Sequence, residues 1–140
     1  CIFALRERGF DVVHDDLVAF LERDRESYAG ASLLQVAEHL SWPRIERVLT
    51  LLRERIVDGG LLIVETPNPL SPFALGVFHT DPTHVAPLPP EAMRYAVEAA
   101  GFRDARILYQ ARIPHDQFAG PDPRAYYADY AIIAMRRGGQ

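Results

Sequence analysis

Cysteine is nearly absent from this sequence, which has 140 residues and a single cysteine, Cys1. One thiol excludes a disulfide within the chain and a cysteine-rich zinc site, and it fits a reducing compartment, so the cytoplasm is the expected location. Basic residues are in the minority, because 15 arginines are outnumbered by 19 acidic residues and the formal net charge is −4. This charge provides no broad basic surface, so nucleic acid is not expected as the main partner.

Long apolar runs are also missing. No stretch approaches the ~18 apolar residues that cross a membrane. The first residues, CIFALRERGF, do not have the charged-then-apolar order of a signal peptide. We therefore predict one soluble domain over residues 1–140, without a membrane partner. The chain begins with the pattern of the end of a helix, with Gly9 just beyond it. We therefore expect that a part of the fold precedes these residues.

Apolar residues alternate along the chain between the period of a strand and that of a helix. Strands are predicted at residues 12–13, 31–36, 61–65, 104–113 and 127–137. Helices are predicted at residues 17–21, from Ser41 to a stop at Asp58, and at 90–100. Strands that alternate with helices predict an α/β fold with an open sheet.

Proline is concentrated in one segment, since seven of the eleven prolines lie between residues 67 and 90. Each proline fixes its own φ angle and removes a backbone donor. We therefore predict that residues 67–90 form a shaped loop without regular helix or strand. Asp81 and Pro82, a pair typical of a turn, precede His84 in this loop and would present its side chain rigidly.

Polar side chains follow three of the predicted strands. They are Asp15 and Asp16, residues 35–39, and residues 65–68. In open α/β sheets, ligands bind beyond the carboxyl ends of the strands, so we predict one binding site from these three clusters. Each cluster also has a plainer interpretation: an aspartate before a helix is a typical N-cap, and Glu38 and His39 fit a solvated pair in a loop.

Five segments, in this order, resemble the class I S-adenosylmethionine-dependent methyltransferases: VVHDDLVAFL, SLLQVAEHL, the helix that ends in DGG, LLIVETPNP, and DPTHVAPLPPEAMRYAVEAAGF. They cover nearly the whole chain. The last segment is similar to bacterial methyltransferases that modify small molecules or glycans. The family's glycine-rich motif, GxGxG, and its acidic ribose-binding residue do not occur in these 140 residues. The resemblance is therefore to the C-terminal part of the methyltransferase domain, and we expect its N-terminal strands before Cys1.

The resemblance implies a Rossmann-like sheet with helices on both faces. It implies transfer of a methyl group from S-adenosylmethionine to a small-molecule or glycan (sugar-like) acceptor, at an oxygen atom. The proline-rich segment at residues 67–90 would then shape the acceptor pocket. A second hypothesis, of another class, is a catalytically silent methyltransferase-like module that binds or scaffolds a partner.

The resemblance also assigns the cofactor contacts. It implies that Asp16 accepts a hydrogen bond from the adenine amino group and that the Leu17 backbone N–H donates to a ring nitrogen. Gln35 and Val36 would lie beside the methionine portion. Without the family's first strands, open sheet edges predict a homodimer or a complementing chain, and we expect residues 1–140 alone to bind the cofactor weakly.

Catalysis of methyl transfer depends mainly on positioning, with a general base where the acceptor is a hydroxyl. His39 is the candidate base, because an unperturbed histidine has a pKa near ~6.5. Glu38 would orient His39 or bind metal, and His84 would reach the acceptor from the proline-rich segment. A histidine that only hydrogen-bonds the loop is the alternative for His39.

Metal is a further expectation for Glu38, His39 and His84. They resemble part of the Glu/His set that binds a divalent ion in the small-RNA terminal 2′-O-methyltransferases and, less closely, in the ubiquinone-pathway O-methyltransferases. Carboxylate and imidazole suit Mn²⁺, Fe²⁺, Co²⁺ or Zn²⁺, which could hold acceptor hydroxyls and lower their pKa. Gln35 stands where that set has its first glutamate, which removes one charge.

Overall fold

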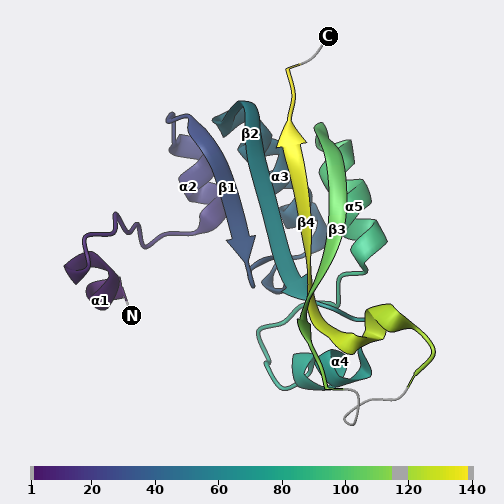
Figure 1. Cartoon of the computed structure of the whole chain (residues 1–140). Coiled ribbons are helices and arrows are strands. Elements are labelled where there is room, and N and C mark those ends of the chain that lie inside the picture. Colours follow the sequence, from purple (N-terminus) through teal and green to yellow (C-terminus); the bar gives the residue numbers. More distant parts are fainter. Residues whose placement is uncertain (1, 115–119, 139–140) are drawn as a thin grey trace.

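A four-stranded sheet forms the centre of the fold in the computed structural model, which describes residues 2–114 and 120–138 (Figure 1). Its strands are β1 (Tyr28–Leu34), β2 (Ile56–Pro67), β3 (Phe102–Arg112) and β4 (Tyr127–Arg136). They lie in the order β1-β2-β4-β3. The first two are parallel, and β4 runs antiparallel to both of its neighbours. The carboxyl ends of β1 and β2 therefore share one edge of the sheet with the amino end of β4.

The helices of the fold are α1 (Ile2–Glu7), α2 (Leu17–Arg23), α3 (Trp42–Arg55), α4 (Pro72–Phe78) and α5 (Pro90–Ala99), with two single turns, η1 (Ala37–His39) and η3 (Pro123–Tyr126). The apolar pattern predicts α2, α3 and α5 among them. α3 begins directly after Ser41, and its stripe at Ile45, Val48 and Leu49 is buried. Among the described residues, no helix has the length and the apolar character of a membrane crossing.

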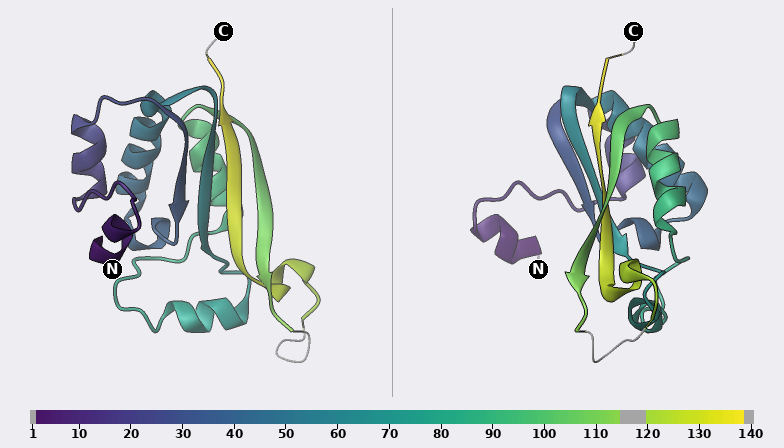
Figure 2. Two further views of the ribbon diagram at one scale, coloured as in Figure 1. Left: turned by 60° about the vertical axis from the view of Figure 1, so that its left-hand side comes forward. Right: turned by 45° about the vertical axis from the view of Figure 1, so that its right-hand side comes forward.

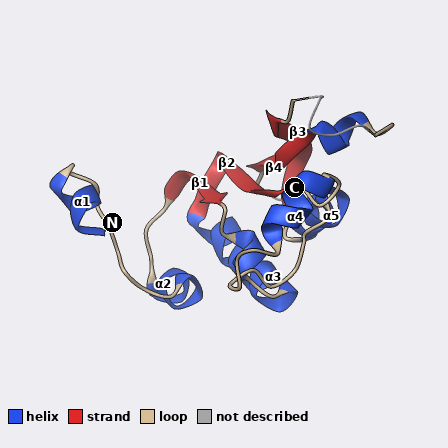
Figure 3. Ribbon diagram, turned by 90° about the horizontal axis from the view of Figure 1, so that it is seen from below, coloured by secondary structure: helices blue, strands red, loops and turns tan. Residues whose placement is uncertain are grey.

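The core lies between one face of the sheet and the helices α3 and α5, with α2 packed beside α3 (Figure 3). The predicted α/β class with a Rossmann-like sheet is therefore confirmed. The opposite face, where helices were also expected, is open over the described residues, and α1 lies apart from it (Figure 2). On that face Leu34, Leu61 and Leu108 remain 55%, 45% and 48% exposed. Helices thus cover one face of the described sheet.

The predicted strand at Val12 and Val13 is wrong. These residues belong to an extended loop before α2, and Val13 is 54% exposed. Two β-branched residues satisfy the local preference for a strand, but a strand also needs a neighbour with which to pair. Here the Val12 carbonyl instead accepts a hydrogen bond from the Arg6 guanidinium at 2.9 Å.

The proline-rich segment contains a helix, which contradicts the expectation of a continuous loop. α4 begins at Pro72, where the missing N–H removes nothing that the first helical turn could use. The Ser71 hydroxyl caps this turn by accepting from the Ala74 N–H at 3.3 Å. Residues 79–89 contain neither helix nor strand, as predicted.

Candidate active site

The chain turns sharply where β1 ends, at the carboxyl edge of the sheet. The Gln35 N–H donates to the Glu65 carbonyl at 3.0 Å, so pairing with β2 continues one residue beyond β1. Gln35 then adopts a left-handed backbone, with φ of 55°, which is uncommon for a residue other than glycine. This conformation directs the next residues into η1, which carries Glu38 and His39.

Glu38 is buried, with 1% of its surface exposed, so the interpretation of Glu38 and His39 as a solvated pair is wrong for Glu38. The Thr66 hydroxyl, on β2, donates to a Glu38 carboxylate oxygen at 2.9 Å. Burial of an ionised carboxylate is unfavourable unless donors or cations surround it. Thr66 therefore fixes a carboxylate that has capacity for further partners.

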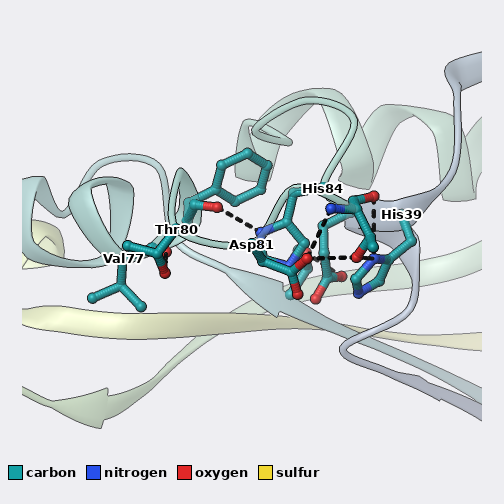
Figure 4. A network of polar contacts seen from close by, with 9 residues as sticks. His39, Val77, Thr80, Asp81 and His84 are labelled. Carbon is teal, nitrogen blue, oxygen red and sulfur yellow. Dashed lines mark hydrogen bonds and ion pairs between the residues drawn. The ribbon is translucent and has the colours of Figure 1, made fainter.

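His39 is oriented by the loop that follows α4 (Figure 4). Its Nδ1 lies 2.9 Å from the Thr83 hydroxyl oxygen, which is itself 2.6 Å from an Asp81 carboxylate oxygen. Because an ionised carboxylate can only accept, the single hydroxyl hydrogen goes to Asp81. His39 Nδ1 must then donate to the hydroxyl, which leaves a lone pair on Nε2 of the neutral ring. The Thr83 hydrogen bonds lower the pKa of Asp81, so its ionised form is favoured.

His84 is oriented in the same way. Its Nδ1 lies 2.8 Å from the Phe78 carbonyl, which can only accept, so Nδ1 carries a proton. Its Nε2 faces an Asp81 carboxylate oxygen at 3.7 Å. The two imidazole rings are 4.7 Å apart between centroids. The Val85 N–H donates to the Glu38 carbonyl at 2.8 Å, which attaches the loop to η1. The loop therefore places His84 beside η1.

Glu38, His39 and His84 come together as predicted, although they come from two separate segments. One ligand atom from each lies within 4.8 Å of the others. Two imidazoles, each held through Nδ1, and one carboxylate form a donor set that suits a divalent transition metal. The residues present thus fit a metal, and equally fit a base supported by acidic neighbours.

Asp16 has the plainer role that the sequence left open, because it caps α2. One carboxylate oxygen accepts from the Val18 and Ala19 N–H groups, both at 3.1 Å, and the other accepts from Arg44 at 2.6 Å. The Ala19 bond and Arg44 lower the pKa of Asp16. Leu17 is the first residue of α2. A carboxylate has about four lone-pair sites, so the contact of Asp16 with adenine stays a prediction.

Gln35 bridges two acidic residues on the open face of the sheet. Its side-chain amide lies 3.3 Å from Glu65 and 3.2 Å from Asp129, and the Gln110 amide donates to the other Glu65 oxygen at 2.9 Å. Burial raises the pKa of Asp129, and the neighbouring charges of Glu65 and Glu38 raise it further. Sequence reasoning missed Asp129, although it is the one acidic residue within the apolar run of β4.

Asn68 belongs to the polar cluster predicted at residues 65–68, although the sequence assigned it no individual role. It is fully buried, and its amide donates to the Arg124 and Tyr127 carbonyls at 2.9 and 2.8 Å. Its side-chain oxygen accepts from the Leu70 N–H at 3.1 Å. These bonds hold the start of the proline-rich segment against the amino end of β4. The visible signal was a polar residue among prolines directly after a buried strand.

The fold and the site together define a class. In the described residues, the helices of this Rossmann-like sheet cover one face, and polar residues gather where its two parallel strands end. Such sheets bind ligands at the carboxyl ends of their strands. The chain is therefore an α/β domain whose polar cluster contains side chains of the types that act in acid–base chemistry and in metal binding.

Comparison with solved structures identifies the class more closely. The chain is similar to a SAM-dependent methyltransferase from Archaeoglobus fulgidus, with a TM-score of 0.83 and 27% identity over 95% of this chain and 71% of that one. It is similar to a SAM-dependent methyltransferase from Thermotoga maritima described as a possible histamine N-methyltransferase, with a TM-score of 0.73 and 19% identity over 94% and 66% of the two chains. Human N-acetylserotonin methyltransferase, solved with SAM, gives a TM-score of 0.69 and 12% identity over 98% and 38%.

Neither a protein-family model nor a curated protein sequence matches the chain. The structural similarity supports the resemblance seen in the sequence: the chain has the fold of the class I S-adenosylmethionine-dependent methyltransferases, and one such protein matches 95% of it at 27% identity. The chain spans 71%, 66% and 38% of the three chains compared.

Proposed function

We propose that the protein transfers the methyl group of S-adenosylmethionine to a hydroxyl oxygen of a small-molecule or sugar-like acceptor at the carboxyl edge of the sheet. The observation that carries this proposal is the convergence of Glu38, His39 and His84, with Nδ1 of each imidazole already engaged by the surrounding loop. The cofactor supplies a methyl group that its sulfonium already activates. The chain's own contribution is to hold the acceptor oxygen and to take its proton.

His39 is the proposed base. Its hydrogen bond to Thr83 places the proton of the neutral ring on Nδ1, so Nε2 presents a lone pair that takes the hydroxyl proton as the oxygen bonds to the methyl carbon. Asp81, linked to His39 through the Thr83 hydroxyl, stabilises the imidazolium that forms. Glu38 lies close enough to do the same from the buried side. Two carboxylates thus favour the protonated product of the transfer.

Gln35 and Val36, with Asp16 and Leu17, are the proposed cofactor contacts of this chain. The ion pair between Asp16 and Arg44 supports this assignment, because it attaches the first turn of α2 to the first turn of α3, just after η1. The two segments thereby lie near the same edge of the sheet. The Asp16 carboxylate remains able to accept a further donor there.

A divalent metal is a second proposal for the same three residues. An ion bound by Glu38, His39 and His84 would lower the pKa of a coordinated hydroxyl. It would also occupy the Nε2 lone pair of His39, so His39 could not be the base at the same time. Cobalt titration gives a readout without turnover: tetrahedral Co²⁺ absorbs visible light, and this absorption should be lost in His84→Ala. Activity that survives exhaustive chelation would exclude the metal and favour the base.

The base proposal is tested in the full-length protein with radiolabelled S-adenosylmethionine and a panel of hydroxylated acceptors. His39→Gln should lower kcat by about 10²-fold or more, the usual contribution of a general base, with unchanged cofactor affinity. His79→Gln is the matched control, because His79 is exposed at the end of α4. Full activity of His39→Gln would contradict the proposal. Absence of transfer to every acceptor, with intact folding, would favour the catalytically silent module.

A further inference from the structure

A cavity of about 470 Å³ adjoins the histidine cluster. α4, the end of β2 and the start of β4 line this open cavity, and His84 is shared between the cavity and the cluster. This volume lies within the range of sites that hold small molecules, roughly 300–1,000 Å³. A molecule in the cavity would therefore have one end at the imidazoles.

One wall of the cavity is apolar. Phe73, Val77 and Phe78 of α4 contribute to it, and Phe73 and Val77 are 47% and 54% exposed. Large apolar side chains that remain half exposed on a short helix, next to a cavity, indicate a surface that an apolar ligand covers. The α4 wall thus matches a flat apolar or aromatic body better than a ring of hydroxyl groups, whose hydrogen bonds it would leave unmade.

The opposite side of the cavity is acidic. Asp129 and Gln35 line it, and Gln35 also contacts Glu65, so two carboxylates lie beside one amide. Among the described residues, no lysine or arginine forms an ion pair with Asp129 or Glu65. A half-buried carboxylate beside other acids and without a basic partner is electrostatically complementary to a bound cation.

We propose that this cavity binds the acceptor, and that the acceptor is a compact molecule with an apolar body that carries a protonated amine. The assignment rests on the proposed methyl transfer and narrows its substrate class. The amine pairs with Asp129, the body packs on Phe73 and Val77, and the atom to be methylated points toward His84 and His39. Of the two acceptor classes that the sequence predicted, the cavity favours the small molecule over the sugar.

Two probes of the same shape test the charge requirement: 2-phenylethylamine, which is protonated at neutral pH, and 2-phenylethanol, which is neutral. Their affinities for the 140-residue chain are measured by ligand-observed NMR titration, without S-adenosylmethionine. The amine should bind about tenfold more tightly, as expected for one charge-assisted contact. Asp129→Asn should abolish this preference and leave 2-phenylethanol unaffected, whereas Phe73→Ala should weaken both probes.

Asp104→Asn is the matched control, because it removes the same charge from an exposed residue at the start of β3, where Asp104 pairs with Arg137. Equal affinity of the two probes, equal effects of Asp129→Asn and Asp104→Asn, or no saturable binding of either probe would overturn the assignment. If the wild-type chain binds the two probes equally well while the full-length protein still transfers methyl groups, the cavity assignment alone is overturned. An intact preference without methyl transfer supports the cavity and overturns the proposed function.

Discussion

Replacement of Thr66 by valine would remove one hydroxyl and keep the shape of the side chain. Thr66 and Glu38 are each 1% exposed, and the 2.9 Å hydrogen bond joins them inside the protein. Hydrogen bonds to charged groups contribute ~1.5–3 kcal/mol, so Thr66→Val should lower the free energy of unfolding by about 2 kcal/mol. With a urea m-value of ~2 kcal/mol/M, the unfolding midpoint should fall by about 1 M.

Thr66→Ser is the control, because it keeps the hydroxyl and removes one buried methyl group, which costs only ~0.8 kcal/mol. The valine variant should therefore be the less stable of the two. If a metal binds at Glu38, loss of the hydroxyl that orients the carboxylate should also weaken the metal affinity by ~10–100-fold. A valine variant as stable as the wild type would show that the Glu38 carboxylate does not depend on this donor.

Three further variants test other parts of the site. Asp16→Asn keeps an oxygen to cap α2 but loses the charge that pairs with Arg44. Because the folded pKa of Asp16 is lowered, the stabilisation that its charge provides is present above the ordinary pKa of 3.8 and is lost as the pH falls. The variant should thus be less stable than the wild type at pH 7 and equal to it in acid, and a constant difference in urea unfolding would refute this. The folded pKa of Asp129 is raised, so the contribution of Asp129 to stability should fall as the pH rises above 3.8, and Asp129→Asn should remove that fall and be more stable than the wild type at neutral pH. His84→Ala should reduce methyl transfer while calorimetry shows unchanged S-adenosylmethionine affinity, and a parallel loss of both would contradict the placement of His84 on the acceptor side.

Long elements with a clear apolar stripe were predictable from the sequence, and short ones were not. α3 and α5 follow their stripes closely, whereas α4 depends on one serine cap and one proline at its first position. β2 is longer than predicted, because Gly59 and Gly60 continue the strand instead of only ending the helix before it. A Cβ at Gly60 would lie 2.6 Å from the Ala29 carbonyl, so this glycine permits the close approach of β1, a requirement that a single sequence does not reveal.

The site was predictable to the extent that it follows the parallel strands. Glu38 and His39 lie beyond β1, and the rule that ligands bind at carboxyl ends found them. Asp129 lies at the amino end of β4, which reaches the same edge only because β4 is antiparallel. Thr83 orients His39 through the fold of an irregular loop, and the sequence carries no periodic signal for such a contact.

The loop that carries His84 also determines the tautomer of His39, because Thr83 and Asp81 belong to it. Under the proposed function, substrate preference and proton transfer therefore depend on the same loop. A designer who exchanged residues 79–89 for the loop of a relative with another substrate would also exchange the partner of the proposed base. A graft without a hydroxyl at position 83 would leave His39 Nδ1 only its longer contact, 3.3 Å, with the backbone carbonyl of residue 83. Retention of Asp81 and Thr83 is thus the first condition for re-engineering this domain.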